Sequence, residues 1–212
     1  MSRYSKNNSG FTLVELLISV GIMSVIFTVV ILNQSKYTDG IALTNLADEI
    51  SSMISQAQVY STGVKELSTG LGEFNASYGL AFSLLSPGGS NSAYIYFADR
   101  DGNNNYNGDW SCPTDTNSEC ISRVDISRGN VIDKFCIEKI DSSQCDTAGN
   151  GAARRVDITF ARPSTEAQIT FFNPSGTSFT PGDVKGVKVV LKSPGGLTRS
   201  VTVYTTGQIS VQ

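Results

Sequence analysis

One carboxylate stands inside the most apolar stretch of the chain. Glu15 is the only charged residue between residues 11 and 32. A charge in hydrocarbon costs a few kcal/mol or more, and such groups usually mark a function or pair with another charge. No Lys or Arg stands at helical spacing from Glu15. The sequence therefore predicts that this carboxylate pairs with a positive group on another molecule.

The residues around Glu15 follow a recognisable order. A short leader with two basic residues ends at Gly10, Phe11 follows, and the apolar run begins with Thr12-Leu13-Val14-Glu15. This order resembles the class III signal of type IV prepilins and type II secretion pseudopilins. The resemblance implies that a prepilin peptidase cuts after Gly10 and that the new amine on Phe11 is methylated. It also implies that the Glu15 carboxylate pairs with the terminal amine of a neighbouring subunit, which sets register in a helical filament.

Two other N-terminal signals compete with this interpretation. An ordinary signal anchor with a single glutamate fits the same apolar run. A cleaved secretory signal fits less well, because its apolar region is only about 7 to 15 residues long and a small-residue cleavage site should follow it. Here the run is followed by Asn33-Gln34-Ser35-Lys36. The pilin resemblance further implies partners, namely other pilin or pseudopilin subunits, the prepilin peptidase, an inner-membrane assembly platform and a cytoplasmic ATPase.

The apolar run is long enough to cross a membrane. At about 1.5 Å per residue, residues 11–32 form a helix of roughly 33 Å, and a bilayer core is about 30 Å thick. Arg3 and Lys6 precede the run, whereas Lys36 and then Asp39, Asp48 and Glu49 follow it. The positive-inside rule then places the N-terminus in the cytoplasm. We expect a single-pass protein of the inner membrane with an exported C-terminal part, which later joins a pilus or pseudopilus filament.

The expected export of the C-terminal part bears on the chemistry of the four cysteines. An exported domain lies in a compartment that permits disulfides, and an even number of cysteines at short spacings predicts two bridges. Three connectivities are possible. We favour Cys112 with Cys120 and Cys136 with Cys145, because each pair closes a short loop. A zinc site is a weaker alternative, because the chain has no Cys-x-x-Cys pair and no histidine.

One acidic and amide-rich segment could hold a cation. Oxygen-bearing side chains alternate at Asp99, Asp101, Asn103 and Asn105, and calcium prefers carboxylate and amide oxygens. The match to an EF-hand loop is poor, because the glycine comes two places early and Trp110 stands where a bidentate glutamate belongs. Asp, Asn and Gly are also the residues of an ordinary hairpin turn. Calcium and a plain turn both stay open, and we expect no other cofactor.

Basic residues are concentrated toward the C-terminus and could contact nucleic acid. Phosphate binding needs such side chains on one face. The acidic isoelectric point of about 5.0 argues against it, but some FimT-type minor pilins are associated with DNA uptake. The candidates are Arg154, Arg155, Arg162, Lys185, Lys188, Lys192 and Arg199.

Catalysis has little support in the sequence. The chain has no histidine, which removes the commonest general base and the His-dependent triads. No phosphate-binding glycine-rich loop with a following lysine occurs. We therefore expect a protein that is not an enzyme.

The elements that position these residues can be read from periodicity. After the apolar run, Leu43, Leu46, Ile50, Met53, Ala57 and Tyr60 recur at spacings of three and four, the stripe of an amphipathic helix. We expect one long helix over residues 11–62. Beyond it, short apolar runs alternate with turn residues, which predicts strands. The expected strands are 78–84, 93–98, 131–140, 156–160, 167–172, 186–191, 199–204 and 208–211.

These elements predict an α+β, pilin-like fold in which one long N-terminal helix packs on a C-terminal antiparallel sheet. The expected parts are a leader at 1–10, the helix at 11–62 with its membrane half at 11–32, and a β-rich head at 63–212. Segments of the head resemble GspH/FimT minor pilins and pseudopilins, namely 78–82, 94–99, 169–177, 199–203 and 207–211. The insertion with the cysteines departs from that pattern.

The function expected from these features is structural. We expect a minor pilin or pseudopilin, cut by the prepilin peptidase and assembled through its N-terminal helix into a type IV pilus or a type II secretion filament. The alternative is a DNA-binding minor pilin of a competence pilus.

Overall fold

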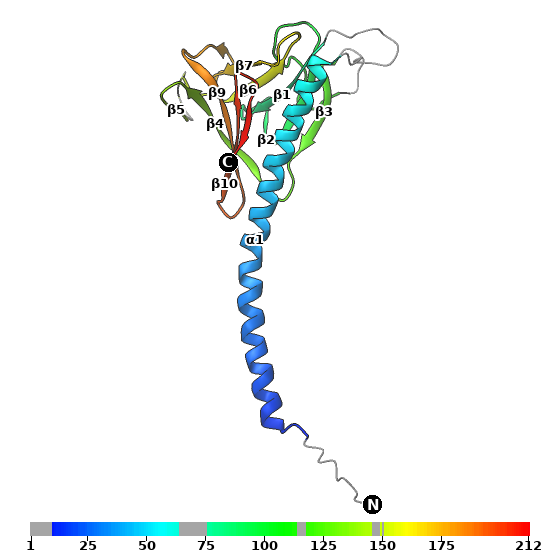
Figure 1. The fold of residues 1–212 in the computed structure, drawn as a ribbon, viewed down its shortest axis with the longest axis vertical. Helices are drawn as coiled ribbons and strands as arrows, with labels where there is room; N and C mark the ends of the chain where they lie inside the picture. The colour runs from blue at the N-terminus through cyan, green and yellow to red at the C-terminus, as the bar shows by residue number, and fades with distance from the viewer. Residues whose placement is uncertain (1–9, 64–75, 114–117, 146–148, 150) are drawn as a thin grey trace, which may run out of the picture. The chain divides into compact units, whose positions relative to one another are not determined.

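The computed structural model describes residues 10–63, 76–113, 118–145, 149 and 151–212. The chain divides into two units, residues 1–38 and residues 39–212. Figure 1 shows the order of the elements along the chain. The basic leader residues Arg3 and Lys6 lie outside the described residues, so their placement stays a prediction.

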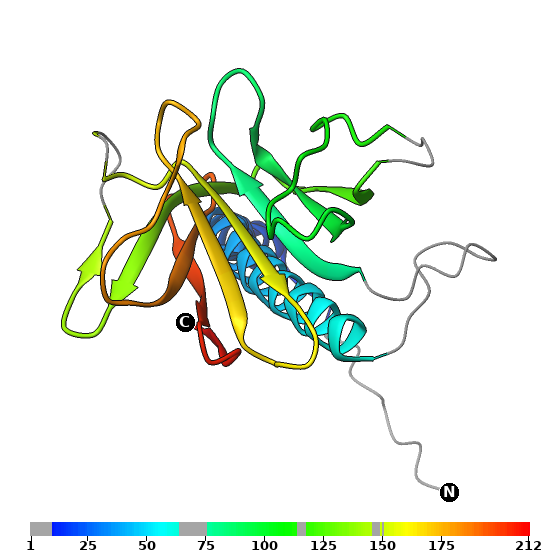
Figure 2. The same cartoon turned by 90° about the horizontal axis from the view of Figure 1, so that it is seen from above.

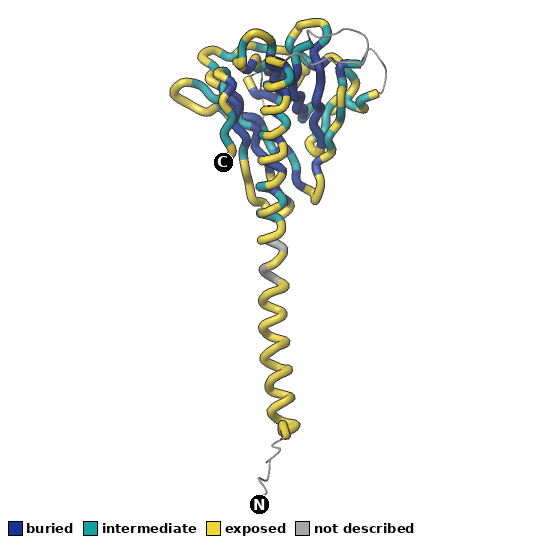
Figure 3. The backbone as a smooth tube through the Cα atoms, turned by 45° about the vertical axis from the view of Figure 1, so that its right-hand side comes forward, coloured by how far each residue is buried: buried dark blue, intermediate teal, exposed yellow. Residues whose placement is uncertain are grey.

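A single helix, α1, runs over Leu13–Thr62 and contributes to both units. In the first unit, Leu13–Ile31 is long and apolar enough to cross a membrane. Its side chains are exposed along this whole length, as the yellow tube in Figure 3 shows. The hydroxyls of Ser19, Ser24 and Thr28 each donate to the carbonyl four residues earlier, at 2.7 to 2.8 Å. The helix therefore satisfies these polar groups itself, as a lipid environment requires.

In the second unit, one stripe of α1 forms part of the core. Leu43, Leu46, Ile50 and Ala57 of the predicted stripe are buried. Met53 and Tyr60 are only partly buried, and they pack at the margin of the core. The spacing of three and four residues thus identified the correct face of the helix.

The remaining elements of the second unit are strands in two antiparallel sheets (Figure 2). Sheet A has the order β3-β2-β1-β6-β7-β8, and sheet B has the order β11-β10-β9-β4-β5. The strand bounds are β1 Ser77–Ser83, β2 Ser90–Asp99, β3 Cys120–Asp125, β4 Val131–Lys139, β5 Ser143–Gln144, β6 Arg155–Phe160, β7 Ala167–Phe172, β8 Ser178–Phe179, β9 Val184–Lys192, β10 Thr198–Tyr204 and β11 Ile209–Val211.

The α+β layout with antiparallel sheets agrees with the prediction, with two differences of detail. The strands form two sheets rather than one, because alternation of side chains specifies which face of a strand is buried but not its neighbour. Three strands were missed. β5 and β8 have two residues each, and β3 is an edge strand with no fully buried position. Both features leave little apolar signal in the sequence.

Sheet A is covered on both faces. Tyr94 and Tyr96 of β2 belong to the main core, which α1 and both sheets share. Ile95 and Phe97 alternate with them and form a second, smaller cluster with Tyr106. Because Tyr106 belongs to the segment after β2, that segment covers the outer face of sheet A. β2 is consequently buried on both sides.

Two disulfides tie edge elements to the sheets. Cys112 bonds to Cys120 at the start of β3, and Cys136 of β4 bonds to Cys145 just after β5. These are the two pairs that the sequence analysis favoured, because each closes a short loop. Each bridge closes a loop of about ten residues, which in the chain-entropy treatment stabilises the folded state by about 2.5 kcal/mol.

We predict that replacing Cys136 and Cys145 together by alanine lowers the free energy of unfolding by about 2 to 3 kcal/mol, because the unfolded chain regains the freedom of the closed loop. Urea unfolding of the purified processed chain in detergent measures this. Ser142→Ala, an exposed change in the same hairpin, is the matched control and should shift stability by less than about 0.5 kcal/mol. A loss below about 1 kcal/mol in the double variant would show that the bridge does not hold β5 in place.

Candidate functional site

The N-terminal motif lies at the exposed start of α1. Gly10 and Phe11 precede the helix and are exposed. A Cβ atom built on Gly10 would meet nothing within 4 Å, so the chain's own packing does not require glycine there. A requirement for glycine at this position would therefore come from an enzyme that reads it.

Thr12 and Glu15 form a reciprocal pair at this helix end. The Thr12 carbonyl accepts the N–H of Leu16 at 3.2 Å, which makes Thr12 the N-cap residue. The Glu15 N–H donates to Thr12 Oγ1 at 3.3 Å. In return, the Thr12 N–H and hydroxyl lie 3.5 and 3.4 Å from Glu15 Oε2. This is a capping box, in which the Glu15 carboxylate serves the first turn of its own helix.

The acidic segment after β2 is built around buried carboxylates. Asp99 Oδ1 accepts the N–H groups of Gly102 and Asn103 at 2.8 and 3.2 Å, and its Oδ2 accepts that of Asn104 at 2.9 Å. Glu119 accepts the N–H groups of Arg100 and Asn107 at 3.4 and 2.8 Å. The carboxylates therefore replace the backbone partners that an irregular loop lacks.

A third carboxylate, on sheet A, anchors the same loop. Asp157 of β6 is fully buried, and its Oδ2 accepts the N–H of Tyr106 at 2.9 Å. Arg155 neutralises it through two bonds, Nε to Oδ1 at 3.0 Å and Nη2 to Oδ2 at 2.5 Å. The Arg155 guanidinium also donates to the Tyr106 carbonyl and stacks over the ring of Phe172 at 4.4 Å. This ion pair fixes the loop onto the outer face of the sheet.

Three of these acidic groups meet closely enough to share a cation. One oxygen each of Asp99, Asp101 and Glu119 lies within 4.8 Å of the other two. Burial raises the pKa of the Asp99 and Glu119 carboxyls, although backbone N–H groups lower it. The charges of Asp101 and Asp99 raise the pKa of Glu119 further. A divalent cation would relieve this repulsion.

Two members of the predicted calcium set, Asp99 and Asp101, lie in this acidic group. The side-chain amide of Asn103 donates to Asp101 Oδ2 at 2.8 Å. Asn105 Oδ1 is buried without a hydrogen-bond partner in the described part of the chain. Glu119 was missed. The favoured Cys112–Cys120 pair could have pointed to it, because Glu119 directly precedes Cys120. Calcium binding stays a prediction.

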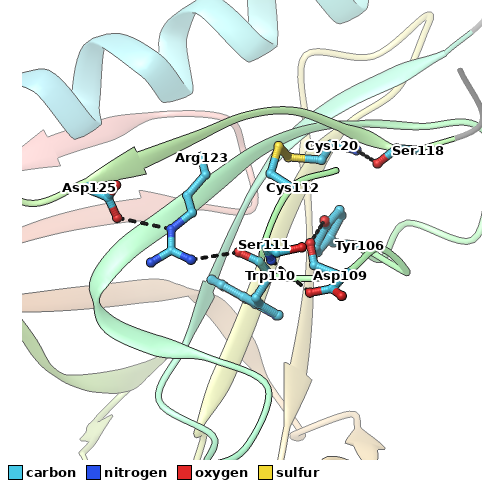
Figure 4. Close-up of a disulfide and its surroundings, with 9 residues drawn as sticks. All are labelled: Tyr106, Asp109, Trp110, Ser111, Cys112, Ser118, Cys120, Arg123 and Asp125. Carbon is cyan, nitrogen blue, oxygen red and sulfur yellow. Dashed lines mark hydrogen bonds and ion pairs between the residues drawn. A yellow bond between two sulfur atoms is a disulfide. The ribbon is translucent and has the colours of Figure 1, made fainter. Parts of the chain in front are cut away.

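The end of the acidic loop is held by the first disulfide (Figure 4). The ring of Trp110 meets that of Tyr106 edge-on, with centroids 6.2 Å apart. Arg123 of β3 donates to the Trp110 carbonyl at 3.0 Å and to Asp125 Oδ1 at 3.0 Å. Because Trp110 is the only tryptophan in the chain, its fluorescence reports on this loop.

The predicted nucleic-acid residues are divided between the two sheets, and several are already engaged. Arg155 pairs with Asp157, Lys188 lies 3.0 Å from Glu138, and Lys192 lies 3.8 Å from Asp133. The other members also differ in their surroundings. Arg154 donates to the Leu84 carbonyl, Lys185 lies over the Tyr204 ring, Arg162 has a partner of its own, and Arg199 is exposed. DNA binding stays a prediction that this geometry does not favour.

Comparison with known proteins identifies the N-terminal signal. Residues 5–31 match the family model described as the prokaryotic N-terminal methylation motif. No curated protein and no solved structure matches the chain. The chain therefore carries a class III prepilin signal, which is consistent with a type IV pilin or pseudopilin. The GspH/FimT subtype stays a prediction.

We predict that Asp99→Ala destabilises the chain by about 2 to 4 kcal/mol, because three N–H groups of the loop lose their acceptor. Urea unfolding followed by Trp110 fluorescence measures the change. Asp125→Ala removes an exposed carboxylate that is paired with Arg123 and should cost less than about 1 kcal/mol. Equal losses in the two variants would refute the scaffolding role of Asp99.

If calcium binds the acidic group, it should raise the thermal unfolding midpoint of the processed chain. A calcium concentration 100-fold above the dissociation constant stabilises by about 2.7 kcal/mol. The measurement compares millimolar calcium with a chelator, in wild type and in an Asp101→Asn, Glu119→Gln variant that lacks two of the three charges. An unchanged wild-type midpoint, or an equal shift in the variant, would end the calcium hypothesis.

Proposed function

We propose that this chain is a structural subunit, a minor pilin or pseudopilin, of a type IV pilus or type II secretion filament. The observation that carries the proposal is the methylation motif over residues 5–31, with Gly10, Phe11 and Glu15 in the order of a prepilin. In this proposal the prepilin peptidase removes the leader after Gly10. The subunit then assembles through α1, driven by a membrane platform and a cytoplasmic ATPase.

The exposed apolar surface of α1 supports assembly through this helix. Leu13–Ile31 is about 28 Å long at 1.5 Å per residue, close to the thickness of a bilayer core. None of its side chains is buried within the described chain. Such a surface needs a cover, which is lipid before assembly and the helices of other subunits afterwards. One segment therefore serves first as an anchor and then as filament core.

The Glu15 carboxylate supports a defined register rather than unspecific helix association. Apolar helices can slide past one another, because their side chains offer similar contacts at many offsets. A single carboxylate in a low-dielectric layer makes one offset far better than the rest when an amine meets it. In our proposal that amine is the methylated N-terminus of Phe11 on a neighbouring subunit.

The second unit supports export. Its two disulfides suit an oxidising compartment, and the positive charges of the leader favour a cytoplasmic N-terminus. Several segments that resemble GspH/FimT proteins lie in β1, β2, β7 and β10. We accordingly place the β-rich domain on the filament surface.

We predict that Glu15→Val is processed normally but enters filaments poorly, at least tenfold below wild type, because the subunit lacks the charge that fixes its register. Immunoblots of the sheared filament fraction and of the membrane fraction measure incorporation and processing in the same cells. Gly10→Asp is the contrasting variant and should leave a longer, uncut precursor. Wild-type incorporation of Glu15→Val would sink the register mechanism.

A further inference from the structure

A polar cavity lies beside the acidic loop, on the outer side of sheet A. Its volume is about 290 Å³, close to the lower end of the range for pockets that hold small molecules in proteins. β7, β8 and the segment after β2 supply its walls. None of the described residues that line it is charged. Its polar side chains are amides and hydroxyls, chiefly those of Asn104, Asn105, Gln168, Thr170, Ser178 and Thr180.

The alternation of side chains along β7 and β8 explains the first polar wall. Phe171 of β7 belongs to the main core, so Gln168 and Thr170 lie on the opposite, outer face of the strand. Phe179 of β8 pairs with Phe171 and packs at the margin of the core. Ser178, its neighbour, consequently also lies on the outer face. The outward positions of both strands therefore carry polar, uncharged side chains.

The opposite wall is held in place before any ligand arrives. Asp99 accepts the N–H of Asn104, and Asp157 accepts that of Tyr106. Asn104 has a φ of 63°, a left-handed conformation that asparagine tolerates better than most residues. The Thr170 hydroxyl lies 3.5 Å from the Asn104 carbonyl and joins this wall to β7. A ligand thus meets a preformed cavity and need not order the loop, which favours binding.

One residue of the cavity wall carries an acceptor without a donor. Asn105 Oδ1 is buried and has no hydrogen-bond partner in the described part of the chain. Such an atom destabilises the free protein, because it has lost water and gained nothing in return. Turning this amide toward the cavity breaks no bond of Oδ1 and lets a ligand hydroxyl donate to it. Binding would therefore remove an energetic cost that the free chain bears.

We propose that this cavity binds one unit of a neutral sugar. A sugar presents several hydroxyls within a small volume, and each hydroxyl both donates and accepts. Amide and hydroxyl side chains also do both, so the two walls suit a ring of hydroxyls. An uncharged lining disfavours phosphates, carboxylates and amines, since a charge taken out of water needs an opposite partner. This inference goes beyond the filament function, because sugar binding by the purified chain does not depend on assembly.

A peptide strand is the competing class of ligand. β8 stands at the end of the order of sheet A, and strand addition to a sheet edge is a common way to bind peptides. We favour the sugar, because strand addition uses backbone groups along an edge and β8 has only two residues. The side-chain amides of the cavity would also stay unused.

The test titrates four neutral sugars into the purified full-length chain and follows the sugar signals by NMR. The sugars are D-glucose, D-galactose, D-mannose and N-acetyl-D-glucosamine. The detergent carries no sugar group, because a glucoside or maltoside would compete. We expect at least one sugar to bind with a dissociation constant of about 2 mM, the value that an ordinary ligand efficiency gives for about twelve non-hydrogen atoms.

Three variants test whether binding occurs in this cavity. Gln168→Leu keeps the size of an exposed side chain but removes its amide, and it should weaken binding about fivefold, as the loss of one hydrogen bond does. Ser178→Tyr places a ring in the cavity and should abolish binding. Gln208→Leu is the matched control, because it makes the same change at an exposed position outside the cavity. It should bind as wild type does, and urea unfolding confirms that all three variants fold.

Each outcome decides for or against the sugar site. Binding of none of the four sugars would overturn it, as would wild-type affinity in Ser178→Tyr or an equal loss in Gln168→Leu and Gln208→Leu. A neutral peptide of Gly, Ser, Asn and Thr that binds when the sugars do not would assign the cavity to strand addition instead. Binding of a sugar with losses in the two cavity variants alone supports the inference. None of these results bears on filament incorporation, so either proposal can fail while the other stands.

Discussion

A charged side chain in an apolar helix needs hydrogen-bond donors or an opposite charge beside it. This requirement applies to the N-terminal part of α1. Glu15 is the only charged residue in a segment that leaves every described side chain exposed. Thr12 supplies part of the match through the capping box. In our proposal the rest comes from another molecule, because no basic residue stands at helical spacing from Glu15.

The β-rich unit also contains carboxylates away from water, but their hydrogen-bond donors lie within the chain. Asp99, Glu119 and Asp157 are buried carboxylates, and each finds its donors within the chain. They bind the backbone of one loop and hold it on the outer face of sheet A. These carboxylates build a scaffold, whereas Glu15 lies at the exposed start of α1.

Sequence reasoning recovered what depends on local order. The prepilin signal is contiguous, and the stripe through Leu43 and Ile50 repeats with the helix period, so both could be read directly. The division into two sheets could not, because strand pairing joins residues distant in sequence. Glu119 was missed for the same reason, since it reaches Asp99 only where the chain returns to sheet A, directly before β3. The capping box is also contiguous, as Thr12-x-x-Glu15, but the same glutamate belongs to the prepilin signal, so the pattern alone does not separate the two roles.

The central claim is that Glu15 contacts the terminal amine of another subunit. Carbodiimide joins carboxylates to amines that touch, so treated filaments should yield a peptide in which Glu15 is linked to the N-terminal residue of a second subunit. Filaments grown from cells that mix light and heavy isotopes distinguish two copies of this chain from one, and mass spectrometry identifies the link. We expect a link between subunits. A link found only within single chains, or no link at Glu15 while other surface pairs react, would contradict it.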